Sequence, residues 1–106
     1  MLQCTIRREN SGFTGKMHPH YTLLLSGSYK YLLSSKKISF IGSSHYVITR
    51  STKEFSRSNP EYLGKLRSNE TGNEYSIFDK GENPNTKVVP ELIRSQLGAI
   101  IFVIFI

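Results

Sequence analysis

Residues 20–35 read HYTLLLSGSYKYLLSS, and this stretch decides the predicted fold. On either side of Ser26-Gly27-Ser28, tyrosine and leucine recur at alternate positions. A period of two is typical of a half-buried β-strand, and a Ser-Gly-Ser triplet between two such runs is typical of a turn. The stretch therefore predicts two antiparallel strands joined by a short turn.

The same pattern continues along the chain, where runs rich in Tyr, Ile, Val and Thr alternate with pieces rich in Gly, Ser, Asn and Pro. We expect strands near residues 2–8, 20–26, 29–35, 37–41, 45–50, 61–68, 74–79 and 97–105. Only Pro90–Gln96 has a helical pattern, and it is weak. Turns about 8–12 residues apart indicate an all-β fold of antiparallel strands. The length of 106 residues suits a single domain, residues 1–106.

The last ten residues, Leu97–Ile106, read LGAIIFVIFI and carry no polar side chain. A membrane-spanning helix needs about 20 such residues, so the sequence predicts no transmembrane segment. A fully buried strand is the alternative, but an apolar strand without a partner is an aggregation hazard. We therefore expect this segment to promote association of a polypeptide that consists of residues 1–106 alone.

Fourteen basic and eight acidic residues give a net charge of +6, and the basic residues are unevenly placed. Residues 1–53 contain eight of them and a single acid, Glu9. A cationic half of this kind favours an anionic partner, either the phosphates of nucleic acid or lipid headgroups.

Two pairs of basic residues are candidate phosphate ligands. Lys36 and Lys37 follow an apolar run, so we expect them where a strand passes into a loop. Lys65 and Arg67 flank Leu66, so they are expected on one face of a strand. Arginine can bind a phosphate with two hydrogen bonds, and lysine acts as a point charge on a flexible stem. Such a set suits a polyphosphorylated headgroup and equally a nucleic-acid backbone.

Other kinds of site have little support. His18, His20 and His45 lack the neighbouring carboxylates or thiols of a zinc or iron site, so we expect loop-surface histidines and no metal. Cys4 is the only cysteine, which rules out an intrachain disulfide. The sequence has no nucleophile elbow, phosphate-binding glycine loop or Cys–His pair at informative spacing, so it predicts neither an enzyme nor a cofactor.

A more specific signal lies in the second half of the chain. Residues 62–69 read YLGKLRSN, and they are followed by Gly72, Tyr75, Ile77, Phe78, Asp79, Gly81, Asn83 and Pro84. This pattern resembles the Y-I-G-K-L-R-S-N…G-x-x-F-x-V-Y-D-x-G-x-N-P signature of the Tubby family. Residues 4–8 (CTIRR), 31–37 (YLLSSKK) and 93–100 (IRSQLGAI) resemble three further motifs of that family.

The resemblance implies a fold similar to a closed β-barrel threaded by a hydrophobic helix from the far C-terminus of the domain. The matched motifs cover only the N-terminal portion of that domain. We therefore expect a partial Tubby-like C-terminal domain, a fragment truncated before the barrel closes and without the central helix.

The resemblance also implies a function. It predicts a non-enzymatic adaptor or regulatory domain that binds phosphoinositide headgroups, especially phosphatidylinositol 4,5-bisphosphate. Such a domain is cytoplasmic and peripheral at the plasma membrane. Family members also occur in the nucleus and cilia, so signalling or ciliary trafficking proteins are further candidate partners.

Carried over by position, Lys36 and Lys37 match the family's strand-end basic pair, and Arg67 matches the arginine of K-L-R-S-N. The resemblance therefore predicts these three as phosphoinositide ligands. The family's basic run continues past the pair, whereas residues 38–41 here read ISFI, and Gly42 and His45 replace a basic residue and an asparagine. At about 1 kcal/mol per basic residue near an anionic surface, losing two or three weakens binding by one to two orders of magnitude.

The alternative function is a small basic nucleic-acid-binding or transcription-regulatory β-module. Such modules stack bases on exposed aromatic side chains beside a basic groove. Here Tyr29, Tyr31, Tyr46 and Tyr75 fall at alternate, core-type positions. If these rings are buried, lipid headgroups are favoured over nucleic acid.

Overall fold

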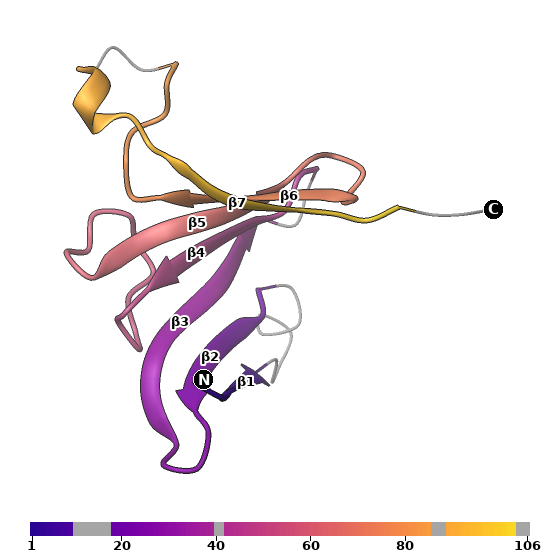
Figure 1. The fold of residues 1–106 in the computed structure, drawn as a ribbon. Coiled ribbons are helices and arrows are strands. Elements are labelled where there is room, and N and C mark those ends of the chain that lie inside the picture. The colour runs from indigo at the N-terminus through magenta and orange to yellow at the C-terminus, as the bar shows by residue number, and fades with distance from the viewer. Residues whose placement is uncertain (10–17, 40–41, 86–88, 104–106) are drawn as a thin grey trace.

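The computed structural model describes residues 1–9, 18–39, 42–85 and 89–103, which form one antiparallel sheet of seven strands (Figure 1). Each strand pairs with the next one in the sequence, so the order across the sheet is β1 to β7. The strands are β1 (Cys4–Glu9), β2 (His20–Leu25), β3 (Lys30–Ser39), β4 (His45–Thr49), β5 (Tyr62–Ser68), β6 (Glu74–Asp79) and β7 (Gln96–Ile101). One turn of 3-10 helix, η1 (Pro90–Leu92), precedes β7. The prediction of an all-β antiparallel fold is confirmed.

The predicted break between residues 35 and 37 is wrong, because β3 is a single strand of ten residues. Ser34 pairs with Thr22 on one side and with Thr49 on the other, so this small polar residue continues the ladder. Lys36 and Lys37 therefore lie within a strand and not where a strand passes into a loop. The remainder of the predicted strand over residues 37–41, residues 40 and 41, lies outside the described residues.

Two predictions for the C-terminal third also need correction. The expected helix over residues 90–96 is limited to η1, because Ile93 is already extended (φ −70°, ψ 140°) and the Arg94 N–H donates to the Glu82 carbonyl (2.8 Å). The strand expected over residues 97–105 is β7, and it ends at Ile101, before Phe102 and Val103. Residues 104–106 lie outside the described part of the chain. No helix in the described residues is long and apolar enough to cross a bilayer.

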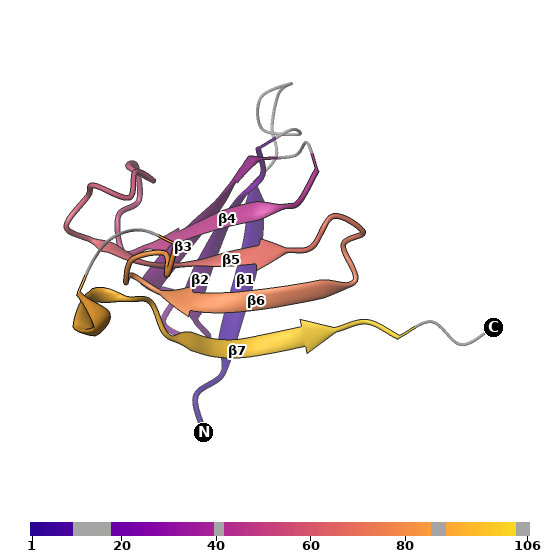
Figure 2. The ribbon, with the colours of Figure 1, turned by 90° about the horizontal axis from the view of Figure 1, so that it is seen from above.

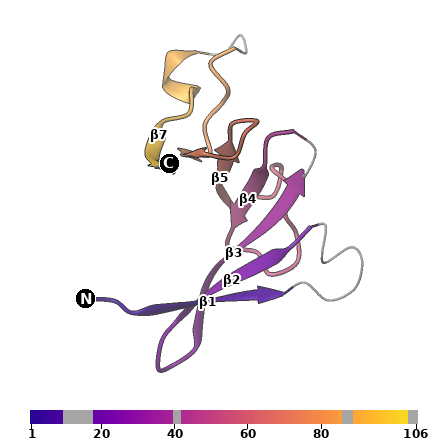
Figure 3. The ribbon, with the colours of Figure 1, turned by 90° about the vertical axis from the view of Figure 1, so that its right-hand side faces the viewer.

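The sheet is an open half-barrel. Its strands twist progressively, and β1 and β7 form its two edges without pairing to each other (Figures 2 and 3). The accessible surface is 7823 Å², whereas a compact monomer of 12.1 kDa exposes about 6,000 Å². The open shape therefore leaves an unusually large part of the sheet in contact with water.

One face of the sheet, which we call the basic face, carries the small core. Thr22, Ser34, Thr49 and Tyr62 lie opposite one another across β2 to β5, and all four are buried. The connection between β4 and β5, residues 50–61, folds back onto this face beside Thr49, Val47 and Tyr62.

Hydrogen bonds hold the covering connection in place. The Thr49 hydroxyl donates to the Glu61 carbonyl (3.0 Å), and the Tyr31 hydroxyl donates to the Arg50 carbonyl (2.8 Å). These two contacts hold both ends of the connection against the sheet.

The opposite face, which we call the apolar face, is poorly covered by the described residues. Six large apolar side chains of this face are only half-buried: Leu23, Leu25, Leu33, Ile48, Leu66 and Ile77. Two shallow hollows lie on this face. One, of about 160 Å³, includes Ile6 and Leu33, and the other, of about 270 Å³, includes Leu66 and Phe102.

Candidate functional site

A row of side chains from four neighbouring strands forms the floor of the site. In the register of the sheet, Lys36 lies opposite Val47, Val47 opposite Lys65, and Lys65 opposite Phe78. Lys65 is buried, with 6% of its surface exposed. Lysine is almost never fully buried unless its ammonium group is paired, so a buried lysine is an unusual feature of this floor.

Gly64 allows the close approach of β5 and β6 beside Lys65. A Cβ at this position would collide with the Phe78 carbonyl oxygen on the neighbouring strand. The glycine of the G-K-L-R-S-N stretch is therefore required by backbone packing at the edge of the site.

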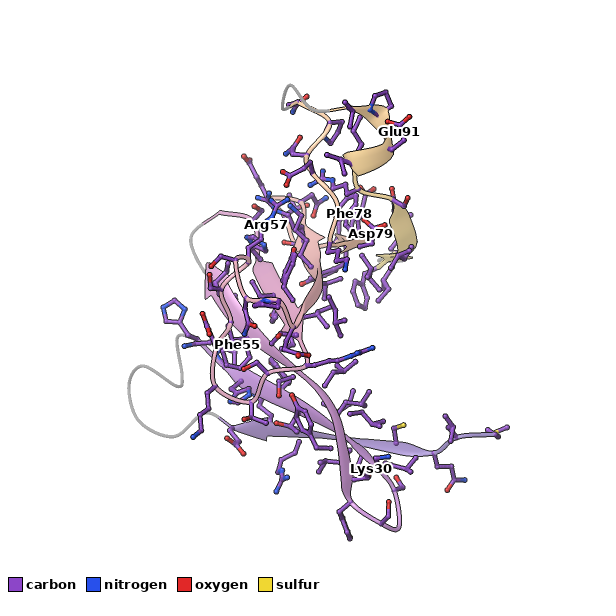
Figure 4. The ribbon with its side chains drawn as sticks, turned by 90° about the vertical axis from the view of Figure 1, so that its left-hand side faces the viewer. Lys30, Phe55, Arg57, Phe78, Asp79 and Glu91 are labelled. Atoms are coloured by element: carbon purple, nitrogen blue, oxygen red, sulfur yellow. The ribbon has the colours of Figure 1, made fainter. Side chains whose placement is uncertain are left out.

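The β4–β5 connection forms a wall above this floor. Phe55, Ser56 and Arg57 from the connection, together with His45, Val47, Lys65, Ile38 and Tyr62, line a pocket of about 180 Å³. We call this the basic pocket. Figure 4 shows Phe55 and Arg57 on the same side of the sheet, with Arg57 toward Phe78 and Asp79.

Several cations surround the basic pocket. Arg67 lies opposite His45 in the register, next to Lys65 on the same face, which confirms the prediction that Lys65 and Arg67 share one face of a strand. The Arg94 guanidinium stacks on the Phe78 ring, 3.9 Å from its centroid.

Two titratable groups respond to this positive charge. Burial lowers the pKa of His45 to about 4, and the neighbouring Arg67, Lys65 and Arg57 contribute to the same shift. Burial also lowers the pKa of Lys65, followed by the effects of Arg94, Arg57 and Arg67. Burial, the larger cause, penalises any charged group, whereas the smaller contribution of the neighbouring cations reflects a positive field that favours an anion.

The described residues provide little compensation for these cations. Arg57 forms an ion pair with Glu82 (3.0 Å), and no other arginine or lysine of the described residues has a carboxylate within ion-pair distance. Arg94 has a buried Nη1 without a hydrogen-bond partner. Because unpaired buried cations are costly, the arrangement is suited to an external anion.

The structure separates the three predicted phosphoinositide ligands. Lys36 and Arg67 lie on the basic face, and the Lys36 ammonium is 5.8 Å from the centroid of Phe55 in the pocket wall. Lys37 lies on the apolar face, with its ammonium 6.0 Å from the centroid of Tyr46. Neighbouring residues of a strand point to opposite faces, so one anion in the basic pocket cannot contact both lysines directly.

The structure also brings together basic residues that were not among the predicted ligands: Lys65, Arg57 and Arg94. Lys65 could have been included, because its alternation with Arg67 already placed both on one face. Arg57 and Arg94 come from a connection and from the segment before β7, and no local pattern in the sequence brings them to Lys65.

The histidines differ from the expected loop-surface residues. His20 and His45 each begin a strand and are half-buried, and His20 packs edge-on against Phe55, 4.8 Å between centroids. The Nδ1 of His18 lies 2.9 Å from the Lys37 carbonyl. Among the described residues, no three His, Cys, Asp or Glu side chains gather as metal ligands would.

The tyrosines do not form a base-stacking surface beside the basic pocket. Tyr31, Tyr46 and Tyr75 are half-buried, and Tyr46 and Tyr75 line a hollow of the apolar face. The core-type prediction for Tyr29 is wrong, because this residue lies in the β2–β3 turn with φ 55° and is 71% exposed. These positions do not favour the nucleic-acid alternative.

Acidification is expected to destabilise the fold through His45. Its pKa is about 4 in the folded chain and about 6.5 when unfolded, so between these values the unfolded state binds more protons. The free energy of unfolding should therefore fall as the pH decreases from 7 to 5. Urea unfolding of the chain fused to a soluble carrier, at both pH values, should show a smaller decrease for His45→Gln, and an equal decrease would contradict the assignment.

Comparison with known proteins finds one family model and several relatives that all carry the same family name. The model of the family described as the Tub family matches residues 1–102. The chain is 36% identical to mouse Tubby-related protein 2 and 33% identical to human Tubby-related protein 1, covering 96% and 95% of this chain and 19% of each relative. It is 38% identical to rice Tubby-like F-box protein 8, over 91% of this chain and 22% of the relative. The chain thus spans about a fifth of the length of these relatives.

Proposed function

The chain belongs to the Tub family, and on this premise we propose that its basic pocket binds the phosphates of a phosphoinositide headgroup. The proposed role is that of a membrane-tethered adaptor or regulatory domain. The preferred lipid is phosphatidylinositol 4,5-bisphosphate, as the family resemblance implies.

The observation that carries the proposal is the buried Lys65 among Arg57, Arg67 and Arg94. None of the described carboxylates lies within ion-pair distance of Lys65, and the lowered pKa of its ammonium reflects both burial and the neighbouring arginines. A phosphate would supply the missing negative charge, and arginine can bind it with two parallel hydrogen bonds.

The spacing of the lysines supports a ligand with more than one phosphate. Lys36 and Lys65 lie on the same face with one strand between them, and neighbouring strands are about 4.8 Å apart. The two lysine backbones are therefore roughly 10 Å apart, and their flexible side chains can converge on phosphates of one headgroup.

The cellular setting belongs to the same proposal. A net charge of +6 favours the anionic cytoplasmic leaflet of the plasma membrane, where the domain would be peripheral. When the lipid is released, the protein would leave the membrane. It could then reach the nucleus or cilium and bind signalling or trafficking proteins there. The pocket supports binding and offers no argument for catalysis.

The test is flotation of vesicles with the whole chain fused to a soluble carrier, because flotation separates bound protein from aggregates. Vesicles containing phosphatidylinositol 4,5-bisphosphate should carry more protein than phosphatidylserine vesicles of equal total charge. Equal binding to both would contradict a headgroup pocket. An arm with a single-stranded oligonucleotide as competitor tests the nucleic-acid alternative, which predicts complete displacement.

Lys36 and Lys37 provide a matched pair of variants. Lys36→Ala is expected to weaken binding about fivefold, as loss of about 1 kcal/mol near an anionic surface implies, whereas Lys37→Ala should have a smaller effect. Each variant removes one positive charge, and the two positions are adjacent in the sequence. They differ only in the face of the sheet that loses the charge, the basic face for Lys36 and the apolar face for Lys37. Equal effects in the flotation assay would indicate diffuse attraction to the membrane and contradict binding in the pocket.

A further inference from the structure

Arg57 connects the basic pocket to a carboxylate outside it. Its Nη2 forms an ion pair with Glu82 Oε2 (3.0 Å) and donates a hydrogen bond to the Gly81 carbonyl (3.2 Å). These contacts join the β4–β5 connection to the segment that follows β6. The ion pair is half-exposed, with 44% of each side chain accessible, so it is weak and easily exchanged.

The same arginine belongs to the positive field of the basic pocket. Arg57 lines the pocket, and it helps to lower the pKa values of both His45 and Lys65. Glu82 has the opposite effect and raises the pKa of Lys65. The chain therefore places one of its own carboxylates close enough to act on the cations that would hold a phosphate.

Asp79 is close by but is already engaged. Its Oδ1 accepts hydrogen bonds from the N–H groups of Gly81 (3.0 Å) and Ser95 (2.9 Å). This carboxylate is thus held by the backbone, whereas the Glu82 carboxylate is held by Arg57.

We propose that Glu82 is an internal competitor of the bound phosphate, and that Arg57 exchanges the Glu82 carboxylate for the phosphate when the pocket is filled. This inference rests on the proposed phosphate-binding function. A phosphate offers the guanidinium more acceptor oxygens and more negative charge than a carboxylate does. Arg57 is then paired with Glu82 in the unliganded chain and becomes a phosphate ligand when the pocket is filled. The competition from Glu82 lowers the affinity of the site for the phosphate.

The backbone around Glu82 is fixed, so the exchange requires only side chains to move. The Glu82 N–H donates to the Leu92 carbonyl (2.6 Å), and the Glu82 carbonyl accepts from the Arg94 N–H (2.8 Å). A Cβ at the preceding Gly81 would lie 2.5 Å from Arg94 Cα, which shows how closely the two segments pack. Substitution of the Glu82 side chain alone should therefore leave the fold intact.

The experiment compares Glu82→Gln with Glu54→Gln in the whole chain fused to a soluble carrier. Glu54 lies in the same connection as Arg57, is exposed, and loses the same single charge when replaced. Binding is measured on vesicles containing phosphatidylinositol 4,5-bisphosphate and with soluble inositol 1,4,5-trisphosphate, which distinguishes a membrane lipid from a free phosphate. Glu82→Gln should tighten binding about fivefold and Glu54→Gln less than twofold.

Combination with Arg57→Gln separates competition from a general charge effect. In that background Glu82→Gln should tighten binding no more than Glu54→Gln does. If the unmodified chain binds but the two glutamate variants behave alike, the competition by Glu82 is contradicted and the proposed function stands. If the unmodified chain binds neither probe, the proposed function itself fails. Equal thermal unfolding midpoints of the variants verify that folding is unchanged.

Discussion

Gly64→Ala is expected to destabilise the sheet by about 2–3 kcal/mol, at the upper end of what overpacking costs. The added methyl group would collide with the Phe78 carbonyl oxygen, and a backbone atom cannot move aside as a side chain can. Relief requires β5 and β6 to separate beside Lys65, at the floor of the basic pocket. The free energy of unfolding, from urea denaturation of the chain fused to a soluble carrier that itself stays folded, measures the effect.

Gly98→Ala is the matched control for this substitution. Gly98 also lies in a strand, but a Cβ there would meet only the Ile77 Cδ1 at 3.9 Å, an ordinary van der Waals contact. We expect a change within about 1 kcal/mol, since alanine also reduces the entropy of the unfolded chain. Similar losses at both positions would show that β5 and β6 are not held as closely as the structure indicates.

The second large effect concerns solubility. A polypeptide of residues 1–106 expressed alone is expected mainly in the insoluble fraction. Each large apolar side chain left in water forfeits roughly 1.5–3 kcal/mol, and three or four such losses rival the 5–15 kcal/mol stability of a typical domain. The six half-buried side chains of the apolar face reach that number.

The apolar C-terminal segment, from β7 onward, is expected to be the main site of self-association. Phe102 and Val103 are 58% and 66% exposed, and β7 forms an edge of the described sheet with no charged residue in its length. Uncharged apolar edges pair readily with other chains. Removal of Ile101–Ile106 should therefore increase the soluble fraction.

Point variants test the same idea with less disturbance. Val103→Lys should raise the soluble fraction, whereas Val89→Lys, which adds the same charge at another exposed valine, should raise it less. The fraction of protein in the supernatant after centrifugation measures both. A soluble monomer of residues 1–106 with a sharp cooperative melt would contradict the expectation.

The strands could be predicted because their apolar residues alternate. Tyr21, Leu23 and Leu25 lie on one face of β2, as a period of two requires, and the same holds for Tyr75 and Ile77 in β6. The break predicted within β3 was wrong because Lys36 and Lys37 follow an apolar run and were expected in a loop. In the sheet Lys36 pairs with His20 on one side and with Val47 on the other, and both partners are distant in the sequence.

The candidate site could be predicted only in part for the same reason. The basic residues of β3 and β5 were recognisable, and Lys65 with Arg67 on one face follows from alternation alone. Lys36 and Lys37 could be assigned to opposite faces only once β3 was known to continue through them. The approach of Arg57 and Arg94 to Lys65 depends on how two connections fold back over the sheet, which local patterns do not encode.

The most direct test of the basic pocket is lysine footprinting by acetylation and mass spectrometry, with and without vesicles containing phosphatidylinositol 4,5-bisphosphate. Lys36, beside the pocket wall, should become protected, whereas Lys37 on the apolar face and the exposed Lys30 at the start of β3 should remain reactive (Figure 4). Protection of Lys37 as strong as that of Lys36, or protection of neither, would contradict a phosphoinositide site on the basic face.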